Sequence, residues 1–219
     1  MRIRPEPPRT WTWPHYIFAQ EIVRAGLEVN GGWRVVGEEN VPAEGGAIVA
    51  ANHLSFLDPP ALGAALPRRT YFFAKAELFV PVFGFIIRML NAFPVERGGT
   101  DMGATKGAIR LLRAGELMVM FPEGTRSRDG QLQELNLGAV LLASRAGVPV
   151  LPAAIWGSDS VFPIGAKCMF PGSVCVSFGE PIDTRQLGPK PCKDELAQMN
   201  DQLREVILDL QAEQRKMEG

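Results

Sequence analysis

A short apolar strand and a helix are encoded in residues 47–66, which read AIVAANHLSFLDPPALGAAL. The apolar run over 47–51 predicts a buried strand. Residues 59–66 begin with two prolines, which suit the first turn of a helix. A polar segment containing His53 and Asp58 connects the two elements, so these side chains are expected just beyond the end of the strand.

The alternation of strands and helices extends over most of the chain. Further strands are predicted at 33–36, 70–74, 93–95, 117–121, 150–155 and 174–178. Helices are predicted at 14–27, 102–114, 137–146 and 194–214, with a broken helix around Pro81 in 77–90. Short apolar strands alternating with helices are typical of an α/β fold, so we expect a mostly parallel central sheet flanked by helices. Functional sites in such folds gather beyond the carboxyl ends of the strands.

The length and composition favour one domain with an appendage. A chain of 219 residues with 46% hydrophobic and 21% charged residues is too apolar for a disordered protein. We expect an N-terminal amphipathic helical segment over 1–30 and one main domain over 31–219. The longest uncharged stretches, 45–57 and 146–158, are shorter than the roughly 20 apolar residues that a membrane span needs.

Charge and cysteine usage exclude several classes of protein. The 23 basic and 24 acidic residues produce no overall positive field, which argues against a general nucleic-acid binder. Three cysteines without CxxC spacing and only two histidines argue against disulfides and a His-rich metal site, so we expect no metal and no cofactor. Prolines interrupt the N-terminus where a secretory signal needs an apolar core, which favours a cytoplasmic location.

Positive charge is concentrated in the middle of the chain. Residues 68–128 hold ten basic against five acidic side chains, a local charge of +5. A solvated helix face accounts for Arg110 and Arg113. Arg97 and Arg126 instead follow predicted strand ends, where an anionic ligand would bind.

His53 and Asp58 are candidates for acid–base chemistry. A histidine can take up a proton near neutral pH, and a neighbouring carboxylate can fix its tautomer and stabilise the imidazolium. On a continuous helix two side chains five residues apart diverge by about 140°, so the pair requires the segment to turn. The alternative is that Asp58 serves only as the N-cap of the following helix.

Residues 121–127, FPEGTRS, form the second candidate. Gly124 lets the backbone approach a ligand closely, and Arg126 can bind a phosphate through two parallel hydrogen bonds. Arg97 and Lys75 also follow predicted strands and can add positive charge. The alternative is an ordinary polar surface turn.

Together these segments resemble the glycerolipid acyltransferases that acylate 1-acyl-sn-glycerol-3-phosphate. Residues 52–58 match the family's NHxxxxD motif, and 121–127 match its FPEGTRS motif without a substitution. Residues 93–97, FPVER, resemble its second block, although Glu96 stands where an aspartate is common. Residues 148–152, VPVLP, resemble its fourth block.

The resemblance implies an O-acyltransferase of phospholipid synthesis that makes phosphatidic acid. Acyl-CoA or an acyl-carrier protein would be the donor, and a lysophospholipid the acceptor. His53 would be the general base and Asp58 its partner, with no covalent acyl-enzyme. The implied phosphate ligands are Arg97, Arg126 and Lys75. The implied pocket residues are Asn52, Ser55, Glu123, Gly124, Thr125 and Ser127.

Several alternatives stay open at this point. The acceptor could be glycerol-3-phosphate or another lysophospholipid, and the chain could instead be a non-catalytic lipid-binding protein or a thioesterase. Both substrates carry fatty chains, so we expect peripheral attachment to the inner face of the cell membrane. The aromatic and basic N-terminal segment and the apolar run 78–87 are candidate contacts, unless they pack on the protein itself.

Overall fold

Seven strands form one sheet within the part of the chain that the computed structural model describes, residues 13–75, 91–95 and 102–218. Their order across the sheet is β1-β7-β6-β2-β5-β3-β4. β7 is antiparallel to β6, and every other neighbouring pair is parallel. The strands are β1 Trp33–Val36, β2 Ala47–Ala51, β3 Thr70–Lys75, β4 Ala92–Val95, β5 Leu117–Met120, β6 Val150–Trp156 and β7 Val174–Phe178.

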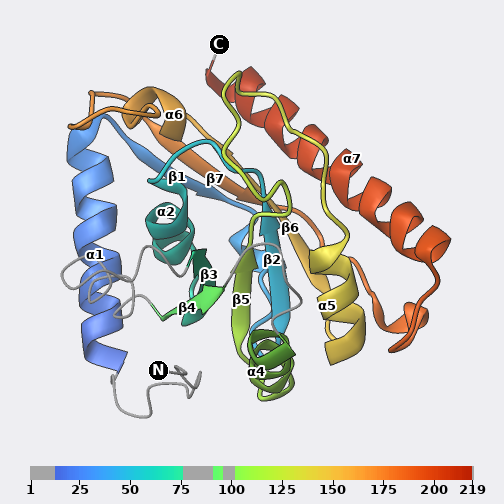
Figure 1. Ribbon diagram of the computed structural model, residues 1–219. Coiled ribbons are helices and arrows are strands. Elements are labelled where there is room, and N and C mark those ends of the chain that lie inside the picture. Colours follow the sequence, from blue (N-terminus) through green and yellow to red (C-terminus); the bar gives the residue numbers. More distant parts are fainter. Residues whose placement is uncertain (1–12, 76–90, 96–101, 219) are drawn as a thin grey trace.

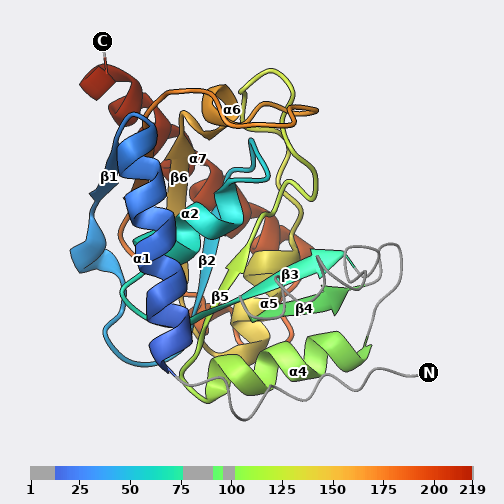
Figure 2. The same ribbon diagram turned by 90° about the vertical axis from the view of Figure 1, so that its left-hand side faces the viewer.

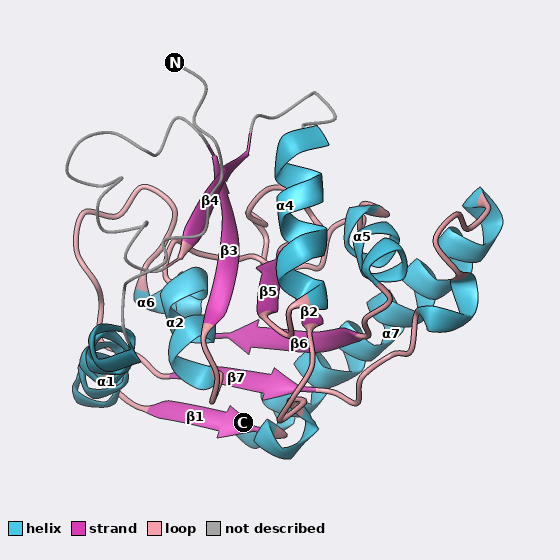
Figure 3. Ribbon diagram, turned by 90° about the horizontal axis from the view of Figure 1, so that it is seen from below, coloured by secondary structure: helices cyan, strands magenta, loops and turns pink. Residues whose placement is uncertain are grey.

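Helices cover both faces of this sheet, as Figures 1 and 3 show. The α-helices are α1 Trp13–Asn30, α2 Asp58–Ala65, α4 Met102–Arg113, α5 Gly138–Ala146, α6 Ser158–Val161 and α7 Lys193–Glu218. Within the described residues, the 3-10 helices η1 Glu38–Asn40 and η3 Arg185–Leu187 lie in connections. The mostly parallel sheet flanked by helices confirms the predicted fold class. The helix predicted at 77–90 lies outside the described residues.

The two faces of β2 explain why it occupies the centre of the sheet. Ile48 and Ala50 pack into the core under α4, α5 and α7, while Val49 packs into the second core under α1 and α2. All five residues of β2 are buried, as expected for a strand covered on both sides. β5 and β6 lie parallel on its two sides, so the carboxyl ends of three strands converge on one edge.

The α1 helix packs along α2, at the left of Figure 2. The Tyr16 hydroxyl hydrogen-bonds Thr70 at 3.0 Å, and the Gln20 amide donates to the carbonyls of Gly63 and Leu66. Leu27 is buried in the core beneath the helix. One face of the predicted N-terminal helical segment is therefore part of the protein core.

Several arginines of the basic middle segment lie at the opposite edge from the carboxyl ends of β2, β5 and β6. Arg68 donates hydrogen bonds to the carbonyls of Gly45 and Gly115, which precede β2 and β5. Arg69 pairs with Glu116 beside them. Their charge is used to hold loops together, and it adds nothing to a ligand site beyond the carboxyl ends.

Candidate active site

His53 and Asp58 form a hydrogen-bonded pair beyond the carboxyl end of β2. His53 Nδ1 lies 2.7 Å from Asp58 Oδ2, and the two side chains are 17% and 0% exposed. The same Oδ2 accepts hydrogen bonds from the backbone N–H groups of Leu54 and Ser55. Because Oδ2 is an acceptor, the hydrogen lies on Nδ1, and Nε2 remains the nitrogen that can take up a proton.

The connection between β2 and α2 turns as this pair requires. Asp58 is the first residue of α2, yet its carboxylate does not cap that helix, which has Leu57 as its N-cap and no side-chain cap bond. The carboxylate instead holds the N–H groups of the preceding turn. The interpretation of Asp58 as a mere helix cap is therefore wrong.

The segment 121–127 packs against His53 along both its ring and its backbone. The Phe121 ring stacks on the imidazole with centroids 4.1 Å apart. The Ser127 N–H donates to the His53 carbonyl at 2.7 Å, and the His53 N–H donates to Glu123 Oε1 at 2.6 Å. The two sequence motifs, far apart along the chain, thus form one hydrogen-bonded unit.

Glu123 is buried and links His53 to the loop that follows this segment. Its second carboxylate oxygen accepts the N–H of Gln133 at 2.8 Å, so both oxygens are bound within the protein. Burial raises the pKa of the Glu123 carboxyl, against the opposing effect of the two backbone N–H groups. Glu123 shapes the site by holding His53 and the 121–136 loop together.

Of the other predicted pocket residues, three are buried and two are exposed. Asn52 is fully buried, and its amide bonds both backbone groups of Ile155 on β6. Ser55 is buried and donates to the carbonyl of Phe162. Gly124, with φ of +69°, and Thr125 are exposed. Ser127 is buried and bonds Asp129.

Arg126 is the predicted phosphate ligand whose side chain the structure describes. Its guanidinium carbon lies 3.7 Å from the centroid of the Phe56 ring, a cation–π contact. Within the described part of the chain Arg126 takes part in no ion pair. Lys75 ends β3, but its side chain is not described, and Arg97 lies outside the described residues.

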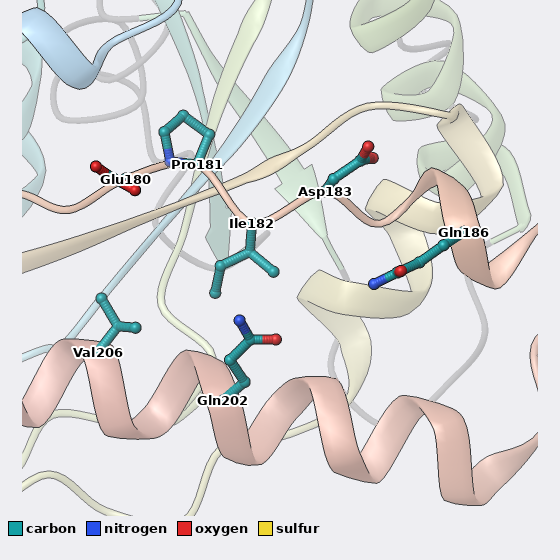
Figure 4. Close-up of a pocket in the computed structure, with 7 residues that line it drawn as sticks. All are labelled: Glu180, Pro181, Ile182, Asp183, Gln186, Gln202 and Val206. Carbon is teal, nitrogen blue, oxygen red and sulfur yellow. The ribbon is translucent and has the colours of Figure 1, made fainter.

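Two surface hollows differ in their relation to the pair. One of about 180 Å³ lies at the same edge of the sheet as the pair and is lined by Leu54, Ile155, Gly157 and loop residues that include Asp129. The other, of about 430 Å³, lies between the segment 180–186 and α7 (Figure 4). Its Ile182 bonds Val150 at the amino end of β6, so this hollow lies at the opposite edge from His53.

The described residues offer two further observations. They contain no group of three or more His, Cys, Asp or Glu side chains placed to hold a metal ion. None of their helices has the length and apolar character needed to cross a membrane.

The fold and this geometry define an α/β protein with a histidine–aspartate pair arranged for general-base chemistry. The acyltransferase family model matches residues 32–156. The chain belongs to the acyltransferase family and is an O-acyltransferase.

Named relatives agree with this family. The 1-acyl-sn-glycerol-3-phosphate acyltransferase of Bacillus subtilis (strain 168) is 32% identical over 198 residues, which cover 90% of this chain and 96% of that protein. The human 1-acyl-sn-glycerol-3-phosphate acyltransferase beta is 32% identical over 64% of this chain and 52% of its own length. The crystal structure of the 1-acyl-sn-glycerophosphate acyltransferase from Thermotoga maritima matches with a TM-score of 0.74 and 30% identity, over 88% of this chain and 76% of that one.

Proposed function

We propose that this protein transfers a fatty acyl group from an acyl thioester to the free hydroxyl of 1-acyl-sn-glycerol-3-phosphate, giving phosphatidic acid. The observation that carries the proposal is the His53–Asp58 pair at 2.7 Å, joined through the 121–127 segment to Arg126. The names of the relatives support the same acceptor. The donor is acyl-CoA or an acyl-carrier protein.

The proposed reaction needs one base and one orienting cation. Nε2 of His53 takes the proton of the acceptor hydroxyl while its oxygen attacks the thioester carbonyl carbon. The tetrahedral intermediate then expels the thiolate, which receives the proton from the imidazolium, so the products are an ester and a free thiol. Asp58 stabilises the imidazolium, and general-base catalysis of this kind contributes about 10²–10⁴-fold.

Arg126 is proposed to bind the acceptor phosphate, with Arg97 and Lys75 as further cations. Arg126 is next to Ser127, whose N–H bonds the His53 carbonyl, so the cation and the base belong to adjacent backbone. The cation–π contact with Phe56 restrains the guanidinium, and its N–H groups can form two parallel bonds to a phosphate. Fixing the phosphate orients the acceptor hydroxyl toward the base.

An assay of thiol release separates this function from its alternatives. Purified protein is given acyl-CoA or acyl-carrier protein, with 1-acyl-sn-glycerol-3-phosphate, glycerol-3-phosphate, another lysophospholipid or no acceptor. We expect thiol release and phosphatidic acid only with 1-acyl-sn-glycerol-3-phosphate. Release without any acceptor would identify a thioesterase, and lipid binding without release would identify a non-catalytic protein; either result would refute the proposal.

A membrane-contact surface is proposed on the outer face of α1. Phe18, Ile22 and Val29 are 67%, 56% and 90% exposed and follow one another at helical spacing on one face. The end of α1 adjoins the loop 162–172, since the Asn30 amide donates to the carbonyl of Phe170 at 2.7 Å. That loop exposes the apolar side chains of Ile164, Met169 and Phe170 beside Lys167. Apolar side chains next to a cation suit the surface of an anionic bilayer. On this basis we propose that the protein binds the inner face of the cell membrane.

Replacing Phe18, Ile22 and Val29 together by serine should release the protein from membranes. We expect flotation with anionic liposomes to be largely lost, because burial of each apolar side chain in lipid contributes roughly 1.5–3 kcal/mol. The buried face of α1 is untouched, so the fold should persist. A matched control replaces Val36 and Met217, which are exposed elsewhere. Equal flotation of the triple variant and the wild type would reject this surface.

A further inference from the structure

We infer that Ser158 is a positioning residue for the catalytic pair and acts through Asp58, an inference that rests on the proposed function. Ser158 is fully buried, and its hydroxyl donates to Asp58 Oδ1 at 2.5 Å across 100 residues of sequence. It belongs to none of the four motif segments. Its position just beyond the carboxyl end of β6 is the sequence signal for such a role, although no periodic apolar pattern marks this segment.

Ser158 completes the set of bonds around the Asp58 carboxylate. Oδ2 accepts from Leu54, Ser55 and the His53 ring, whereas Oδ1 has Ser158 as its partner among the described residues. A carboxylate held at both oxygens cannot rotate about its last bond. Oδ2 therefore stays in line with Nδ1 of His53.

The turn that brings Ser158 to Asp58 depends on glycine. Gly157 has φ of +79°, and a Cβ at this position would collide with the carbonyl oxygen of Ser173. This left-handed residue lets the chain leave β6 sharply and place the next side chain beneath the catalytic segment. A second serine bond, from Ser55 to the Phe162 carbonyl, fastens the same two segments.

The Ser158 bond also sets how strongly Asp58 holds the imidazolium. A hydroxyl that donates to Oδ1 draws part of the negative charge away from Oδ2. Without it, the carboxylate attracts the proton on the ring more strongly and is held through Oδ2 alone. The alignment of the base with the acceptor hydroxyl is then relaxed.

The experiment compares Ser158→Ala and Ser158→Thr in the full chain, with Ser160→Ala, an exposed neighbour on α6, as the control. We expect Ser158→Ala to lower kcat roughly tenfold without changing KM for either substrate. The acid limb of its pH profile for kcat/KM should move to higher pH. Ser158→Thr keeps the hydroxyl, so its kcat and the position of its acid limb should be close to those of the wild type.

Failure of this inference is distinguishable from failure of the proposed function. If Ser158→Ala keeps wild-type kcat and pH profile while His53→Ala is inactive, the inference is overturned and the catalytic pair stands. If kcat falls only in step with a lower unfolding temperature and the pH profile does not move, Ser158 is merely structural and the inference is again overturned. If His53→Ala is active, the proposed mechanism itself fails.

Discussion

His53→Ala should lower kcat for acyl transfer by about 10²–10⁴-fold, the usual contribution of a positioned general base. Among the described side chains of the site, the imidazole has a nitrogen placed to take the acceptor proton, since Nδ1 is bound to Asp58 and Nε2 is left. Because the acceptor phosphate is proposed to bind other side chains, KM should change little. Acceptor-dependent thiol release under saturating substrates measures the effect.

The fold should survive this substitution. Asp58 keeps its bonds from Leu54, Ser55 and Ser158, so no buried carboxylate is left without partners. The matched control is His15→Ala, which removes the other histidine of the chain and should keep wild-type kcat. An active His53→Ala protein, or equal losses in both variants, would contradict the role of His53.

Arg126→Lys should raise KM for the phosphorylated acceptor by about tenfold or more, because hydrogen bonds to charged groups contribute roughly 1.5–3 kcal/mol and lysine lacks the planar fork. Lysine keeps the charge but cannot form two parallel bonds to one phosphate. It also loses the contact of the guanidinium carbon with the Phe56 ring, whose centroid is 3.7 Å away. Initial rates over a range of 1-acyl-sn-glycerol-3-phosphate concentrations measure the change.

Two controls make this prediction specific. Arg128→Lys alters an exposed arginine two residues along the same loop and should leave KM unchanged. The KM for the acyl-thioester donor at saturating acceptor should be the same in wild type and Arg126→Lys, because the proposed role of Arg126 is to bind the acceptor phosphate. If the KM of Arg126→Lys for the phosphorylated acceptor equals that of the wild type, Arg126 does not bind the phosphate.

Periodicity predicted the fold well because β2, β5 and β6 are buried on both faces. In the sequence, such strands are continuous runs of apolar residues. The helices between them have apolar faces, so the local sequence is sufficient to recognise both kinds of element. The exceptions are short. α6 and the two 3-10 helices fall in stretches where polar residues, glycines and prolines leave no periodic pattern.

The count of charged residues along the chain predicted the site less well than the apolar pattern predicted the fold. Arg68, Arg69 and Arg126 belong to the same basic stretch, yet the first two bind loops and Glu116 at one edge of the sheet. Arg126 lies in the loop that bonds His53, beyond the other edge. Residues of one basic stretch lie at opposite edges because β5 carries the chain from Glu116 at one edge to the 121–127 segment at the other.

The sequence by itself determined the alternating α/β architecture, the placement of His53 and Asp58 after a buried strand, and the family resemblance of residues 52–58 and 121–127. Only the tertiary structure decided that Asp58 holds the turn before α2 instead of capping the helix, that Glu123 braces His53 across 70 residues, and that Ser158 reaches Asp58. Strand and helix patterns are local properties of the chain. These bonds join loops that meet only because parallel strands bring their carboxyl ends to one edge, and no local pattern records which loop side chains will then touch.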